Sequence, residues 1–148
     1  QAILPMKTWM TTLTLAVLLA AGASARQDSL PKELAALQGT WVIVSLNGQS
    51  PADQGITMTL SFTGNNYTQS LNGEVVETGT FKLDATKKPL ALDFTIVAGD
   101  DAGKLQLGIV EIGDQTARFG LAEPGSANRP TGFTEGAAAV VVIAKKAK

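Results

Sequence analysis

Hydrophobic and polar residues alternate in short runs along most of the chain after residue 39, which is typical of strands with one buried face. The clearest run is 56–63, where Ile, Met, Leu and Phe alternate with Thr and Ser. Gly, Asn, Asp and Pro separate the runs, as turn residues do. The pattern predicts about eight strands, over residues 40–46, 56–63, 66–71, 74–83, 90–96, 105–109, 116–122 and 137–144.

Short connections predict how these strands are joined. Asn72-Gly73 is typical of a type I′ hairpin turn, and Thr63-Gly64-Asn65 is a further tight turn. Consecutive hairpins without a crossover helix favour an all-β fold, namely an up-and-down antiparallel barrel. An open sandwich is the alternative, because periodicity determines which face is buried and not whether the sheet closes.

The residues before the first strand have a helical pattern. Ser29 suits an N-cap and Pro31 the first turn, while Leu34 and Leu37 recur on one face. Gly39 ends this segment and lets the backbone bend into the first strand. We therefore predict a short N-terminal helix over 28–37 that covers one end of the barrel.

Trp41 stands at the start of the first predicted strand, two residues after Gly39. An indole has enough apolar surface to plug one end of a small barrel. Gly39 and Trp41 are therefore predicted to have structural roles.

The first residues have the pattern of a secretory signal. Met6-Lys7 is followed by an apolar run over 9–21 and by Ala23-Ser24-Ala25, which predicts cleavage after Ala25 and a secreted or periplasmic protein. Residues 1–5 precede the expected initiator Met6. The alternative is an uncleaved anchor, although the run is shorter than the ~20 residues of a spanning helix. We expect a single domain over 26–148, without membrane association after cleavage.

Composition limits the chemistry of this domain. The 148-residue chain has a net charge of −1 and no long basic run, so no nucleic-acid partner is expected. It has no Cys and no His, which removes thiol chemistry, disulfides and the commonest general base and metal ligand. Asp100-Asp101 offers too few oxygens for calcium. We expect no enzyme activity, no cofactor and no metal site.

Several runs carry a family resemblance: LQGTWVIVS at 37–45, GTFKLD at 79–84 with KKP at 87–89, LGIVEI at 107–112 and NRPTGF at 128–133. They resemble a family of small secreted lipocalin-like proteins, which planctomycete bacteria carry as large paralogous sets. The resemblance spans nearly the whole mature chain and implies an exported calycin-like barrel, without an assigned activity. The chain departs from the family at Gly120, where typical members have a larger or thiol residue.

The pair Gly39 and Trp41 is also similar to the opening motif of lipocalins. In that motif a basic side chain from the last strand lies over the Trp. The resemblance implies that Arg118 or Lys145 takes this structural part here.

Four polar residues on strands are candidates for ligand binding. Tyr67 and Gln69 share a face with Leu71, Glu77 shares one with Phe81, and Glu111 shares one with the apolar residues of 105–109. A carboxylate on an apolar face can orient a ligand. The alternative for each Glu is a strand-end residue that reaches water, and for Tyr67 a core residue with a solvated hydroxyl.

Arg129 lies in the longest predicted loop and is the fifth candidate. Its guanidinium suits a carboxylate or phosphate group. The alternative is that Arg129 ties the loop to the barrel through a nearby acid.

Three classes of function follow. The first is a carrier with a small apolar or amphipathic molecule in the barrel mouth, at the end opposite the helix. The second is a cell-envelope interaction module with a solid core. The third and weakest is a glycosidase-like enzyme that uses Glu77 and Glu111. An interior cavity above ~300 Å³ favours the carrier.

Overall fold

The structure is a computed structural model that describes residues 30–148. The predicted leader, the cleavage site after Ala25 and the cap Ser29 lie outside the described residues. Lys32–Lys148 form one compact unit. Its elements are α2 (Lys32–Leu37), β1 (Gly39–Leu46), the 3₁₀ helix η1 (Pro51–Gln54), β2 (Met58–Thr63), β3 (Asn66–Leu71), β4 (Glu74–Asp84), β5 (Leu90–Ala98), β6 (Leu105–Ile112), β7 (Thr116–Leu121) and β8 (Val140–Lys146).

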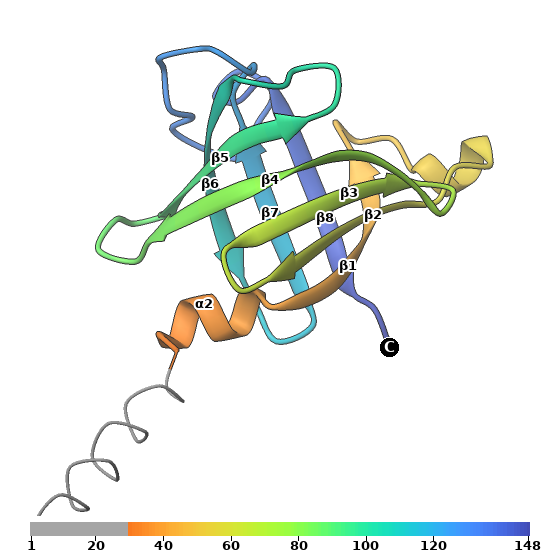
Figure 1. The fold of residues 1–148 in the computed structure, drawn as a ribbon, viewed down its shortest axis with the longest axis horizontal. Helices are drawn as coiled ribbons and strands as arrows, with labels where there is room; N and C mark the ends of the chain where they lie inside the picture. Colours follow the sequence, from red (N-terminus) through yellow and green to blue (C-terminus); the bar gives the residue numbers. More distant parts are fainter. Residues whose placement is uncertain (1–29) are drawn as a thin grey trace, which may run out of the picture. The chain divides into compact units, whose positions relative to one another are not determined.

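The eight strands of the described chain close into an up-and-down barrel (Figure 1). Each strand pairs antiparallel with the next, and β8 pairs with β1, where Trp41 lies opposite Lys146. The predicted closed barrel is therefore confirmed and the open sandwich is excluded. The 3₁₀ helix η1, in the connection between β1 and β2, was not predicted.

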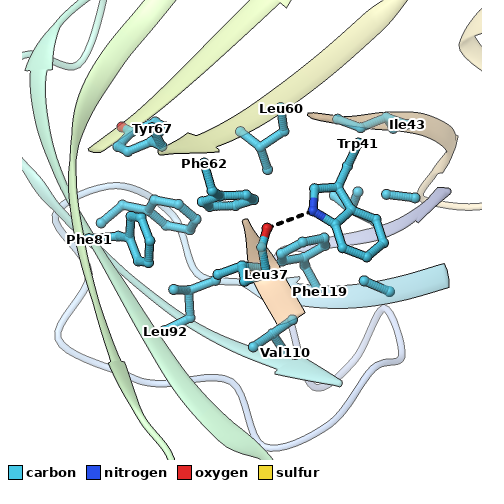
Figure 2. Packing of buried hydrophobic residues seen from close by; sticks show 14 residues of the cluster. Leu37, Trp41, Ile43, Leu60, Phe62, Tyr67, Phe81, Leu92, Val110 and Phe119 are labelled. Atoms are coloured by element: carbon cyan, nitrogen blue, oxygen red, sulfur yellow. Dashed lines mark hydrogen bonds between the residues drawn. The ribbon is translucent and has the colours of Figure 1, made fainter. Parts of the chain in front are cut away.

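The α2 end of the barrel is packed with large apolar side chains (Figure 2). Trp41 and Leu37 are fully buried. Phe62 meets Phe81 edge-on at 5.1 Å between ring centroids and stacks on Phe119 at 6.3 Å. This aromatic cluster fills the barrel beneath α2, which leaves the opposite end as the place for any opening.

Trp41 holds α2 against the barrel. Its indole Nε1 donates a hydrogen bond to the carbonyl oxygen of Leu37 at 2.9 Å, the dashed line in Figure 2. This bond satisfies a carbonyl at the C-terminus of the helix. Gly39 has φ 107°, a conformation that only glycine adopts freely, so the chain turns sharply between α2 and β1. The predicted structural roles of Gly39 and Trp41 match these contacts.

The cation over Trp41 is neither Arg118 nor Lys145. Lys146 Nζ lies 4.9 Å from the centre of the indole ring. Lys145 is its neighbour on β8 and is exposed, because successive side chains of a strand point to opposite faces. Arg118 lies 4.3 Å over the ring of Phe133 in the long loop. The expectation for Arg118 and Lys145 was therefore wrong.

The long loop over 122–139 covers part of the outer surface of the barrel. Ile109 on β6 is only 2% exposed although it points outward. At Gly120 on β7 an added Cβ would lie 3.0 Å from the carbonyl oxygen of Gly132 and 3.2 Å from Ile109 Cγ1. Gly120 thus allows the close approach of this loop, because a larger side chain would have to displace it.

Candidate ligand cavity

A cavity of about 200 Å³ lies inside the barrel at the end opposite α2. Asp101, from the β5–β6 turn, and Pro124, from the long loop, line its outer part. Its deeper wall is apolar, formed by Ile43, Leu60, Phe94, Phe119, Leu121 and Val142. Phe119 belongs both to this wall and to the aromatic cluster, so the packed cluster forms the floor of the cavity.

Strand pairing brings three of the sequence candidates into this cavity. Tyr67 and Gln69 lie opposite Phe62 and Leu60 of β2, so they face the interior. Gln69 also pairs with Glu77 of β4. All three side chains, of Tyr67, Gln69 and Glu77, line the cavity.

Tyr67 and Glu77 form a hydrogen-bonded pair. The Tyr67 hydroxyl donates to Glu77 Oε2 at 2.8 Å. Burial raises the pKa of Tyr67 well above its ordinary value, and the hydrogen bond to Glu77 and the negative charge of Glu77 raise it further. The hydroxyl therefore keeps its proton and serves as a fixed donor to the carboxylate.

Gly79 leaves the space that the Tyr67 ring occupies. An added Cβ on Gly79 would lie 2.8 Å from Tyr67 Cε1 and 2.1 Å from the carbonyl oxygen of Thr95. On its other side, the Tyr67 ring meets Phe94 edge-on at 4.7 Å. These neighbours fix the ring, and with it the hydroxyl that holds Glu77.

Gln106 is a cavity residue that sequence reasoning missed. Its Nε2 donates to the carbonyl oxygen of Ala122 at 2.9 Å, which leaves Oε1 as an acceptor at the cavity. Gln106 lies opposite Phe94 in the pairing of β5 with β6. The polar residue between Leu105 and Leu107 is the available signal, because alternation places Gln106 on the face opposite the two leucines.

Glu111 does not belong to the cavity. It shares a face with Leu105, Leu107 and Ile109 as predicted, but this face is the outer one, covered in part by the long loop. Glu111 is exposed and pairs with Arg118 at 3.0 Å. Its prediction as a ligand-binding residue is not supported by this position.

Arg129 ties the long loop to the barrel. Its Nη1 and Nη2 donate to the two carboxylate oxygens of Asp93 on β5, and Nη1 also donates to the carbonyl oxygen of Gly108 at 2.9 Å. The hydrogen bond to Asp93 raises the pKa of Arg129. The guanidinium lies outside the cavity, so its interpretation as a ligand clamp gives way to the alternative of a loop anchor.

Two polar groups at the cavity have unused hydrogen-bonding capacity. Within residues 30–148, neither the Gln69 amide nor Glu77 Oε1 has a hydrogen-bond partner. In the same range no fully buried side-chain nitrogen or oxygen lacks a partner, so both groups are open to solvent or to a guest. The cavity therefore combines apolar walls with free polar groups.

The described chain shows neither a metal cluster nor a membrane helix. Among residues 30–148 no group of three or more Asp and Glu side chains is placed to hold a metal ion. None of the helices in that part of the chain has the length and apolarity to cross a membrane.

The fold and the cavity define a small lipocalin-like barrel, with eight antiparallel strands and one short helix at its closed end. Comparison with protein-family models, with curated proteins and with solved structures finds no match to this chain.

Proposed function

We propose that this barrel binds a small, mainly apolar molecule in the cavity at the end opposite α2. The observation that carries the proposal is the cavity of about 200 Å³, with an apolar wall and free polar groups at Gln69 and Glu77. Small-molecule sites have this composition: apolar surface supplies affinity and a few polar groups fix orientation.

The volume limits the size of the guest. The cavity of about 200 Å³ does not reach the ~300 Å³ that we expected of a carrier, which is the lower limit of sites for drug-sized ligands. An engineered apolar cavity of ~150 Å³ holds benzene. We therefore propose a guest of about one ring with a short chain, rather than a long fatty acid.

The other two classes of function have less support. A solid core, which the interaction module requires, does not fit the observed cavity. A paired-carboxylate enzyme requires two acids on one site, whereas Glu77 lines the cavity and Glu111 lies on the outer face with Arg118. We propose binding without catalysis.

Calorimetric titration with 2-phenylethanol tests the proposal, because this probe has one ring, a short chain and a neutral polar end. We expect a dissociation constant between about 10 µM and 1 mM, which corresponds to about −7 to −4 kcal/mol. Val140→Phe, which fills the cavity, should weaken binding at least about tenfold.

Val97→Phe is the matched control, since Val97 is 62% exposed on the outside of β5. It should leave binding unchanged. If 2-phenylethanol fails to bind at millimolar concentration, or if both variants weaken it equally, the carrier proposal is wrong and the interaction module becomes the better hypothesis.

A further inference from the structure

We infer that the guest is a small apolar amine whose ammonium group faces Glu77. This inference rests on the proposed function and specifies the chemical class of the ligand. It follows from three properties of the cavity: the balance of donors and acceptors, the sign of its charges and the fixed position of the Glu77 carboxylate.

Acceptors outnumber donors at the cavity. Glu77 Oε1, Gln69 Oε1 and Gln106 Oε1 are free acceptors with two lone pairs each, whereas the Gln106 amide nitrogen already uses one of its two N–H groups on Ala122. The Tyr67 hydrogen is used on Glu77. The remaining side-chain donors among the described groups that line the cavity are the Gln69 amide and the second N–H of the Gln106 amide. A guest that brings N–H donors satisfies this set, whereas a guest with acceptors alone leaves it unpaired.

The charged groups at the cavity are both negative. Glu77 and Asp101 line it, and no described Lys or Arg does. Asp101 is offset by Lys104, whose Nζ lies 3.1 Å away, but Glu77 receives only the neutral Tyr67 hydroxyl. An ammonium group compensates a carboxylate beside apolar walls, while a second carboxylate is repelled there.

The Glu77 carboxylate is held in place before a guest arrives. The hydroxyl of buried Tyr67 fixes Oε2, and Gly79 and Phe94 fix the Tyr67 ring. Oε1 is thereby left to the guest in a defined position. Phe94 and Phe119 in the same wall present aromatic surface to the hydrocarbon part of the guest. Such preorganisation strengthens binding, because little side-chain freedom is lost on association.

Three probes with one skeleton test the inference on the purified protein. 2-Phenylethylamine, 2-phenylethanol and 3-phenylpropanoate differ mainly in the charge of the polar end. We expect the amine to bind about tenfold tighter than the alcohol, and the carboxylate at least about tenfold weaker, since charge-assisted hydrogen bonds exceed neutral ones by about this factor.

Glu77→Gln keeps the shape of the side chain and removes its charge. It should reduce the preference for amine over alcohol to less than about threefold. Glu111→Gln makes the same change on the outer face and should leave the order of the three probes as it is. Circular dichroism verifies that both variants are folded.

The outcomes separate this inference from the proposed function. If no probe binds, the proposed function itself is wrong. If the alcohol binds but the carboxylate binds as well as the amine or better, the cavity is a carrier site and the amine inference is wrong. Equal loss of preference in Glu77→Gln and Glu111→Gln also contradicts it. Because the order of probes is measured on the natural sequence, the test does not depend on how Glu77→Gln folds.

Discussion

At the scale of single residues, Trp41 and Tyr67 define the two ends of the barrel interior. Trp41 closes one end through its packing, its bond to Leu37 and the cation of Lys146. Tyr67 stands at the border between packed core and cavity, where its ring is buried and its hydroxyl holds Glu77. Each side chain is buried and also donates one hydrogen bond, so replacing either should measurably lower the free energy of unfolding.

Trp41→Ala should lower the free energy of unfolding by about 3 to 5 kcal/mol, the usual range for a buried aromatic residue. The change removes the indole packing and leaves the Leu37 carbonyl without its donor. Trp41→Phe keeps part of the apolar volume and should cost less, about 1 to 3 kcal/mol. Urea unfolding followed by circular dichroism measures both. A loss below about 1 kcal/mol for Trp41→Ala would show that the indole does not close the barrel.

The pKa of Tyr67 predicts how stability depends on alkaline pH. In the folded protein this pKa is raised above the ordinary value of 10.0. Above that pH the unfolded chain releases the proton while the folded protein retains it, so the unfolded state binds fewer protons and stability falls as pH rises. Below that pH the contribution of this group to stability is constant.

Ultraviolet absorbance tests this expectation directly, because Tyr67 is the single tyrosine of the chain. We expect tyrosinate absorbance to appear only together with the loss of circular dichroism, well above pH 10.0. In urea the same group should titrate near pH 10.0. Ionisation near that pH with the fold intact would mean that the hydroxyl is solvated and that the Glu77 contact is absent.

At the scale of elements, the long loop over 122–139 packs onto the outside of the barrel. It covers Ile109, and its backbone passes close to Gly120. Arg129 fixes it to Asp93 of β5 and to the backbone of β6. The loop therefore acts as a cover for an outer apolar patch, and Arg129 is one of its anchors on the barrel.

Arg129→Ala should lower stability by about 1 to 2 kcal/mol, a modest value because the ion pair is partly exposed. The Arg129 and Asp93 side chains are 36% and 28% exposed. Amide hydrogen exchange should rise across 122–139, including the amide of Ala137, which donates to Thr134. Lys104→Ala removes the more exposed pair with Asp101 and should change stability by less than about 0.5 kcal/mol. Unchanged exchange in the loop of Arg129→Ala would contradict the anchor.

At the scale of the whole molecule, closure of the barrel separates its two ends. α2 and the aromatic cluster fill one end, and the loops at the other end surround the cavity. Because the sheet closes on itself, the described part of the chain has no free strand edge for another chain to pair with. Closure therefore leaves the end opposite α2 as the place of the proposed binding site.

Export with cleavage after Ala25 remains a proposal, because these residues lie outside the described part of the chain. Mass spectrometry of periplasmic or secreted material should find a chain that begins at Arg26 or close to it. Ala25→Asp should block processing, since the cleavage site requires small residues. A chain that retains Lys7 and fractionates with membranes would overturn the assignment.

The sequence by itself determined the strands, the closed end and the turns. Alternation within each run is set by local geometry, because neighbouring side chains of a strand point to opposite faces. Residues such as Leu60 and Phe62 therefore revealed their strand and their shared face. Trp41 indicated the closed end, because a large indole near the start of a strand is buried at the end of the barrel where that strand begins.

The tertiary structure alone decided which face was inner and which groups met. Leu107 and Ile109 are apolar, yet their face of β6 points outward, because the long loop supplies a second layer there. Glu111 shares this outer face and so does not line the cavity, and Arg129 binds the barrel from the loop. Gln106 is on the opposite face of β6 and therefore lines the cavity. Alternation separates two faces without indicating which one is inside, and contacts between residues 36 positions apart, such as Arg129 with Asp93, leave no local pattern.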